Sequence, residues 1–377
     1  MLRCASIIVV LAIGSASMAT SPPPAAAVGQ RPAAPDESAL ARKTMADAAK
    51  ALLAALPAEQ RTKASRAFDD PQRTTWSYLR GERPGLFLSE MSEAHRALAM
   101  RLVESGLSAE GIEKVRLTRE NENINRADEV ARKMVPTYGG DLYAIIVFGT
   151  PGEGLWGWRF EGHHIGLHFS SLGGETTTTP LFFGAFPAAL ASGPSKGTRP
   201  LGAVQDAALD LRRSLSDAQA AQAKVADGSP ADIITGPGRE SALREAETAG
   251  GLAMPDLNER QRELLWGLLV RHAADLRGDL ASDELRRIKA LGVERIRFGW
   301  AGEPELAKPH YYRIAGPGFV IEFDCTSGNP DHVHCVWNDP SRNFGDALRA
   351  HAIDAHAPAG RSSDGAPSAP SPSKPKS

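Results

Sequence analysis

The sequence lacks a long apolar run and a basic surface pattern, and it is poor in cysteine. No apolar stretch reaches the ~20 residues that a membrane-spanning helix needs. Its 377 residues carry 43 basic and 45 acidic side chains. The basic ones form no stripe interleaved with aromatic residues, so nucleic acid is not expected as a partner. Three cysteines allow one disulfide at most.

The first residues form the pattern of a secretory signal peptide. A basic start at Arg3 is followed by a short apolar run over residues 7–13 and small residues up to about residue 19. Removal of residues 1–19 would take away one cysteine and one positive charge, so that the formal net charge changes from −2 to −3 (42 minus 45). We expect a periplasmic or secreted protein with no membrane span after cleavage, and a disulfide between Cys325 and Cys335 rather than a zinc thiolate pair.

Composition divides the rest of the chain into three parts. Residues 20–36 are rich in proline and alanine and read as a linker, because they contain too little apolar surface to fold. Residues 357–377 are predicted to be a disordered tail for the same reason. Residues 37–356 remain, and we expect them to form a single domain.

Within this domain the period of the apolar residues changes several times. Helical spacing predicts helices at residues 38–56, 91–104, 108–134, 201–215, 216–226, 257–276, 280–291 and 344–356, with a restart at Pro57. Alternating or β-branched runs predict strands at residues 142–148, 155–162, 163–172, 294–300, 310–316, 318–325 and 331–337. Residues 176–190 are apolar and interrupted by proline, and we expect a buried, irregular wall there.

This order of blocks predicts the α+β class. A helical N-terminal part would pack on an antiparallel β-sheet or sandwich, with further helices between the two strand blocks. One face of the strands is apolar and the other polar, which fits antiparallel pairing better than parallel pairing.

Five of the ten histidines lie in two short runs, one in each strand block, at residues 159–169 and 331–337. In the second block we place Cys325 opposite Cys335, and any slip by an even number of residues keeps the same division between the two faces. One face then carries the polar residues Glu322, Asp324, His332, His334 and Asn338. The other carries Phe323, Cys325, Cys335 and Trp337.

The first block contains the run RFEGHHIGLHF at residues 159–169. On an extended strand Arg159, Glu161 and His163 share one face, whereas His164 and His168 share the other. The latter two histidines would lie ~13 Å apart, too far to bind one metal ion without a bend. We therefore expect either His163 or His164 to combine with the histidines of the second block.

Three imidazole nitrogens predict a divalent transition metal, which is zinc, copper or ferrous iron. His163 or His164 would bind it together with His332 and His334. Glu161 or Glu322 would serve as general base or carboxylate ligand, and Arg159 would orient an anionic group of the substrate. Whether the substrate is a small molecule or derived from a polymer is left open.

Three readings of these residues stay open. A metal-dependent enzyme is the leading one, with hydrolysis favoured over oxidoreduction because it requires only one open position on the metal. The second is a non-catalytic periplasmic protein that binds a ligand or metal through the histidines and Trp156, Trp158 and Trp337. In the third, the histidines are hydrogen-bonded residues of the sheet, with no ligand.

Long stretches of the chain resemble one protein family, DUF3500. The resemblance rests on FDDPQRTTWSY, FGTPGEGLWGWRFEGHHIGLHF, PLFFGAFPA, YYRIAGPGFVIEFD and HVHCVWNDPSRNFGDALRAH, and it covers about residues 48–351. It implies no activity, because the family is one of unknown function. The resemblance also implies that the recurring histidines of the family are His163, His164, His332, His334 and His351.

Overall fold

The computed structural model describes residues 37–326 and 328–350. The predicted signal peptide, linker and C-terminal tail therefore lie outside the described residues, as does His351. The last predicted helix is seen only from residue 346 to residue 350.

Helices dominate the first part of the chain, as predicted. Serine side chains begin two of them, because the hydroxyl of Ser92 accepts a hydrogen bond from the amide of His95, and that of Ser108 from the amide of Gly111. The helices are α1 (Glu37–Ala55), α2 (Ala58–Ala64), α3 (Glu93–Gly106) and α4 (Ala109–Ala131), with short 3₁₀ turns η1 (Pro71–Arg73) and η2 (Leu88–Glu90).

A second group of helices separates the two strand blocks. Ser216 and Asn258 begin two of these helices with capping boxes, in which Gln219 and Gln261 reach back to the cap. The helices are α5 (Gly202–Ser214), α6 (Asp217–Ala223), α7 (Glu240–Thr248), α8 (Glu259–Ala273) and α9 (Gly278–Ala290), with 3₁₀ turns η3 (Met254–Asp256), η4 (Val293–Arg295) and η5 (Asn343–Gly345).

All the strands join one sheet. The first block holds β1 (Ser65–Arg66), β2 (Leu86–Phe87), β3 (Ala144–Phe148), β4 (Trp156–Gly162), β5 (Ile165–Leu172), β6 (Glu175–Thr177) and β7 (Leu181–Ala185). The remaining strands are β8 (Lys224–Ala226), β9 (Leu252–Ala253), β10 (Arg297–Gly302), β11 (His310–Gly316), β12 (Phe319–Cys325) and β13 (Val333–Asn338).

The order along the sheet is β1-β3-β4-β5-β7-β13-β12-β11-β10-β8. Neighbours are antiparallel except at the two ends of this path, where β1 pairs with β3 and β8 with β10 in parallel. The α+β prediction is confirmed, with a single sheet instead of a sandwich. Strand β7 joins the two blocks, so the irregular wall expected there is wrong. Pro180 and Pro187 flank this strand without interrupting it, which hid it in the sequence.

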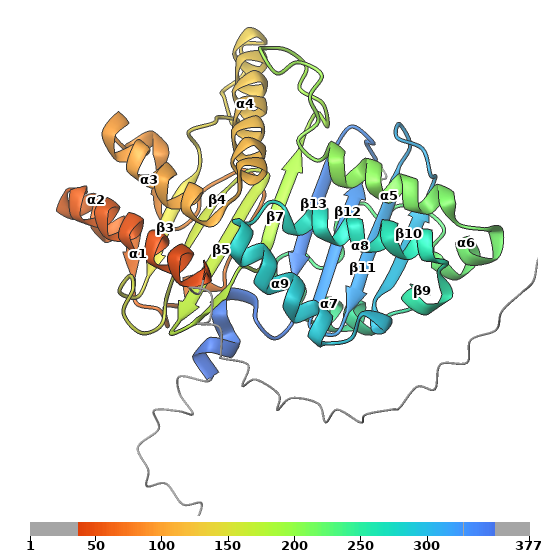
Figure 1. Ribbon diagram of the computed structural model, residues 1–377. Coiled ribbons are helices and arrows are strands. Elements are labelled where there is room, and N and C mark those ends of the chain that lie inside the picture. Colours follow the sequence, from red (N-terminus) through yellow and green to blue (C-terminus); the bar gives the residue numbers. More distant parts are fainter. Residues whose placement is uncertain (1–36, 327, 351–377) are drawn as a thin grey trace, which may run out of the picture. The chain divides into compact units, whose positions relative to one another are not determined.

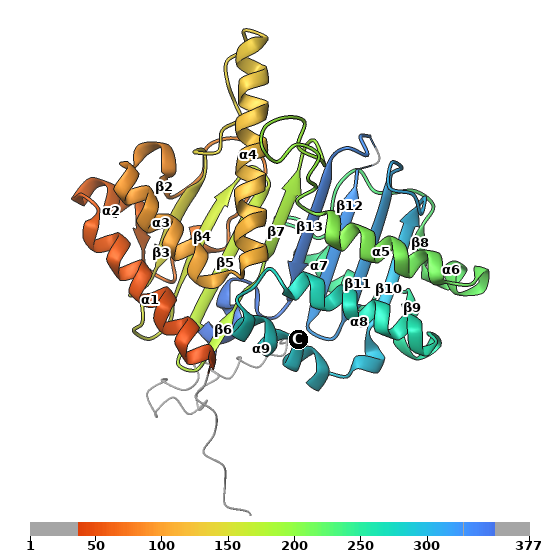
Figure 2. The same cartoon turned by 45° about the horizontal axis from the view of Figure 1, so that its top comes forward.

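The two faces of the sheet differ in what covers them. One, the helix face, carries apolar side chains such as Trp158, Phe183 and Phe323 in the main core. Helices α1, α3, α4, α5, α8 and α9 lie over it (Figures 1 and 2). The other, the loop face, carries the polar side chains and is covered by residues 67–87 and 227–239, through contacts such as those of Arg159, Glu322 and His168.

The β12–β13 hairpin has the predicted faces but a different register. Asp324 lies opposite His334, and Phe323 lies opposite Cys335. The register is shifted by two residues from the predicted one, so the polar side chains keep a common face. The shift also places Val333 opposite Cys325. Both cysteines are free and buried, so the predicted disulfide is wrong.

Candidate metal site

Two of the histidines lie in the turn between β4 and β5. Gly162 pairs with Ile165, so the chain reverses at His163 and His164. His164 adopts a left-handed backbone conformation with φ 65°. The Tyr143 hydroxyl donates a hydrogen bond to the His163 carbonyl at 2.7 Å. A Cβ on Gly162 would stand 2.2 Å from the Tyr143 ring, so glycine is required for this packing.

The reversal corrects the predicted geometry of this block. Arg159, Glu161 and His163 do not share one extended strand, because the strand ends at Gly162. His168 returns on β5 and lies opposite Arg159. The turn at His163 and His164 does not bring His164 and His168 together, and His168 joins none of the candidate clusters of the described residues.

The other two histidines come from the start of β13. His334 lies on the loop face opposite Gly184 of β7. His332 precedes the strand, where its amide donates to the Asn329 carbonyl and its carbonyl accepts from the Thr326 amide. The ring of His332 packs against Phe186, with centroids 5.2 Å apart. The turn at His163 and His164 and the start of β13 thus meet at the same end of the sheet.

The three rings of His164, His332 and His334 form a compact cluster. The Nε2 atoms of His164 and His332 are 2.9 Å apart. The His334 ring centroid lies 4.5 Å from that of His332 and 5.4 Å from that of His164. One nitrogen from each ring lies within 4.8 Å of the others, which is a separation that a metal ion can span. Gly184 makes this approach possible, since a Cβ there would stand 2.6 Å from His164 Cδ2 and 2.9 Å from His334 Cδ2.

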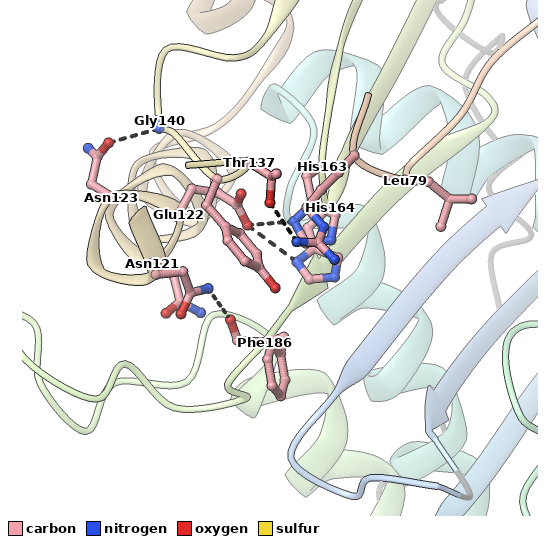
Figure 3. Close-up of polar contacts among 12 residues, drawn as sticks. Leu79, Asn121, Glu122, Asn123, Thr137, Gly140, His163, His164 and Phe186 are labelled. Carbon is pink, nitrogen blue, oxygen red and sulfur yellow. Dashed lines mark hydrogen bonds and ion pairs between the residues drawn. The ribbon is translucent and has the colours of Figure 1, made fainter. Parts of the chain in front are cut away.

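Carboxylates face the outward nitrogens of the cluster. Glu122 of α4 is hydrogen-bonded to His163 Nδ1 at 2.8 Å, and its same oxygen lies 3.7 Å from His164 Nδ1 (Figure 3). His334 Nδ1 lies 2.9 Å from Asp232 and 3.2 Å from Asp324. Glu122 forms a second candidate cluster with His163 and His164, and the two aspartates form a third with His334.

Burial separates the pKa values of these groups. It lowers the pKa of His163 and of His332 to about 3, and that of His164 well below its usual value. Burial raises the pKa of Glu122 to about 8. For His334 the effect of burial is outweighed by the neighbouring aspartates, which raise its pKa to about 9. Three of the four histidines are therefore neutral at pH 7, the form that binds metals.

A cavity of about 830 Å³ opens beside the cluster. His163, His332 and Glu122 line one side of it. Its remaining wall combines apolar, aromatic and cationic side chains, among them Leu79, Phe87, Tyr138, Leu142, Phe186, Arg80 and Arg83. The site thus has both a donor set and a space beside it for a ligand.

The structure places the predicted charged residues elsewhere. Glu322 is fully buried and accepts hydrogen bonds from Thr235, Ile234 and the Tyr311 hydroxyl. Glu161 lies between two arginines, 3.4 Å from Arg83 and 3.3 Å from Arg159.

Arg159 itself is held by backbone carbonyls of the loop that contains Gln72 and Thr75. Within the described chain, Glu322, Glu161 and Arg159 neither line the cavity nor join a candidate cluster. The histidines at 163, 164, 332 and 334, by contrast, are brought together.

Three carboxylates of the site were not predicted. Asp324 was placed on the correct face but given no role. Asp232 lies in an irregular loop with no pattern to mark it. Glu122 lies in the polar run RENENIN of α4, yet its side chain is buried. No local pattern in this run distinguishes Glu122 from its polar neighbours, so the sequence offers no signal for it.

Comparison with known proteins agrees with the motifs of the sequence. A family model described as a protein of unknown function, DUF3500, matches residues 38–346. The chain belongs to the DUF3500 family. No curated protein and no solved structure matches it significantly, so the family adds no activity to the geometry above. None of the helices within the described residues has the length and apolar character to cross a membrane.

Proposed function

We propose that this DUF3500 protein is an exported, metal-dependent enzyme whose metal ion is held by His164, His332 and His334. The observation that carries the proposal is the position of the three rings. They present converging nitrogens, and two of them, His164 and His334, have the other nitrogen directed at a carboxylate. Such carboxylate–histidine pairs orient imidazole ligands in known metal sites. His332 also lines the cavity, so an open coordination position on the metal would face the cavity.

Hydrolysis of an ester or amide is the reaction that this arrangement supports best. A metal bound by three histidines lowers the pKa of a bound water molecule to about 7. The hydrogen-bonded pair of His163 and Glu122 lines the same cavity as His332. We assign to this pair the transfer of the proton from the attacking water to the leaving group. Glu122 takes the role first expected of Glu161 or Glu322, because those two carboxylates are occupied by other partners.

The cavity wall favours an organic substrate with an anionic group. The Arg80 guanidinium lies over the Tyr138 ring at 4.5 Å and donates a hydrogen bond to Thr137 at 2.7 Å. Its side chain is 44% exposed, so it can still bind a carboxylate or phosphate. Phe87 and Phe186 would cover the apolar part of the substrate.

Elemental analysis tests the proposal. The mature protein is purified without chelators or a histidine tag and compared with the His332→Ala/His334→Ala double variant, folded as judged by circular dichroism. At least one equivalent of a transition metal in the wild type, lost in the variant together with hydrolysis of a panel of esters and amides, supports it. A wild type that stays metal-free after incubation with zinc, copper and iron contradicts it.

Export is tested separately. N-terminal sequencing of the protein from the periplasm or the medium should find a start near residue 20. A cytoplasmic protein that keeps residues 1–19 would contradict this part of the proposal.

One observation favours a second function, that of a non-catalytic metal carrier. The three candidate clusters share residues and run from Glu122 to Asp324, which is more donors than one catalytic ion requires. A carrier would bind metal and turn over no substrate, and its ions would be coordinated by protein ligands alone.

A further inference from the structure

Two aspartates flank the side of His334 that faces away from the histidine cluster. Asp324 of β12 lies directly opposite His334 in the sheet. Asp232 comes from the loop between β8 and α7. His334 Nδ1 lies 2.9 Å from an oxygen of Asp232 and 3.2 Å from an oxygen of Asp324. One donor atom from each of the three residues lies within 4.8 Å of the others.

This group has more carboxylate oxygens that accept hydrogen bonds than it has donors to satisfy them. Nδ1 of His334 carries at most one hydrogen, and it lies between two carboxylates. Asp232 has other partners, since it accepts hydrogen bonds from the Tyr78 hydroxyl at 2.6 Å and from the Ile233 amide at 2.8 Å. Asp324 is fully buried, and no donor among the described residues forms a well-directed hydrogen bond to either of its oxygens. Among the ion pairs of the described residues, Asp324 has only the His334 ring, 3.2 Å away, and Asp232 shares the same ring nitrogen. Two buried carboxylates that share one N–H group are unfavourable, and a further cation would stabilise them.

We propose that Asp232, Asp324 and Nδ1 of His334 hold a second divalent cation, which His334 links to the first. The proposal rests on the proposed function for the first ion, because both ions use His334. Two carboxylates and one imidazole suit Mn²⁺, Fe²⁺ or Zn²⁺ rather than a soft ion such as Cu⁺. The two negative charges also balance the charge of a buried divalent ion, which the three histidines cannot do.

Binding through both ring nitrogens makes His334 an imidazolate. The ring proton then leaves to solvent, and each nitrogen donates one lone pair to one ion. Neither aspartate lines the cavity, so the second ion would be separated from the substrate. Its role would be to fix the His334 ring and to increase the electron density that this ligand supplies to the first ion.

Metal counting with matched variants tests this inference. The mature protein is stripped with chelator, reloaded with Zn²⁺ or Mn²⁺, desalted and analysed. We expect two equivalents in the wild type and one in Asp324→Asn, whose side chain has the same shape without the charge. We also expect one in His332→Ala, which removes a ligand of the first ion only.

Each other pattern has a distinct meaning. One equivalent in the wild type, kept in Asp324→Asn and lost in His332→Ala, overturns the second site and leaves the proposed function intact. One equivalent lost in Asp324→Asn and kept in His332→Ala supports the second site and contradicts the first. No metal in the wild type overturns both.

A spectroscopic measurement covers the case in which Asp324→Asn does not fold. Wild-type protein loaded with Cu²⁺ should show less electron paramagnetic resonance intensity than its copper content predicts, because an imidazolate couples two Cu²⁺ ions antiferromagnetically. Full, uncoupled intensity at two equivalents of copper would overturn the bridge.

Discussion

Deeply buried histidines occur in two different settings in this protein. His164 and His334 lie in the cluster, where ring nitrogens face one another or face carboxylates. His168, His272 and His310 are buried to a similar degree but lie apart from the cluster. Among these three, Nδ1 of His168 donates to the Pro180 carbonyl at 2.8 Å, and Nδ1 of His310 donates to the Lys308 carbonyl at 2.7 Å.

The difference shows that burial alone does not identify a functional histidine. The separate histidines behave as core residues, each with a neutral partner, such as the Tyr312 hydroxyl 2.9 Å from His272 Nε2. In the cluster, Nε2 of His164 and Nε2 of His332 lie 2.9 Å apart, and within the described part of the chain each is hydrogen-bonded only to the other. Carboxylates supply negative charge nearby. A bound cation would satisfy the ring nitrogens and the carboxylates of the cluster. The separate histidines already have neutral hydrogen-bond partners and, among the described residues, no carboxylate to attract a cation.

The largest expected effect is the difference in metal affinity between two matched substitutions, one in the cluster and one at a separate histidine. His164→Asn should weaken Zn²⁺ binding by more than about 100-fold, since the loss of a ligand costs more than the loss of a residue that orients one. His310→Asn, at an equally buried position, should leave the affinity unchanged. Competition with a chromophoric chelator measures both. Equal affinities in the two variants would mean that the two settings do not differ in function.

Glu122→Gln tests the proton-transfer role next to the cluster. It keeps the shape of the side chain and removes its basicity, so kcat for ester hydrolysis should fall by about 10²–10⁴-fold while metal content is retained. Glu113→Gln, on the exposed surface of the same helix, is the control and should behave as wild type. An unchanged kcat in Glu122→Gln would remove this residue from the mechanism.

Gly184→Ala disturbs the cluster without removing a ligand. The new Cβ would press on the rings of His164 and His334, and we expect metal affinity to fall by about 10–100-fold, as when the orientation of ligands is lost. Gly174→Ala is the matched control, because a Cβ there meets no atom within 4 Å. If both variants bind metal as tightly as wild type, the close approach at Gly184 is not needed for the site.

The separate histidines should be visible in the pH dependence of stability. Burial lowers the pKa of His272 to about 3, below its unfolded value, so the unfolded state takes up a proton that the native state does not. Stability is then complete above pH 6.5 and declines as the pH falls towards 3. Between pH 7 and pH 5 the protonation of this residue in the unfolded state should lower the free energy of unfolding by about 2 kcal/mol. Chemical unfolding at pH 7 and pH 5 measures this loss, which should be smaller by that amount in His272→Asn than in the wild type. Equal losses in the two proteins would contradict the assignment.

Much of the fold follows from local patterns in the sequence. Alternation placed His334 and Asp324 on the face opposite Phe323 and Cys335, and this held although the register was wrong by two residues. The error came from assuming that the cysteines pair, whereas the side chains of the hairpin pack with Val333 opposite Cys325.

The rest of the site depends on contacts that no local pattern contains. Glu122 and Asp232 reach the cluster from a polar helix and an irregular loop, and their partners are 41 and 102 residues away in the chain (163 minus 122 and 334 minus 232). The turn at His163 and His164 requires a left-handed conformation at His164, which non-glycine residues in general adopt uncommonly. Strand β7 could be recognised only from its two neighbours in the sheet.

Anomalous diffraction from crystals of the metal-loaded protein tests the central claim most directly. Data collected at the absorption edges of zinc, copper and iron should give a peak between the Nε2 atoms of His164 and His332 and the ring of His334, with density for a further ligand on the cavity side. No peak at any edge, with the rings of His164 and His332 still in direct hydrogen-bond contact, would show that the cluster is a hydrogen-bonded network and not a metal site.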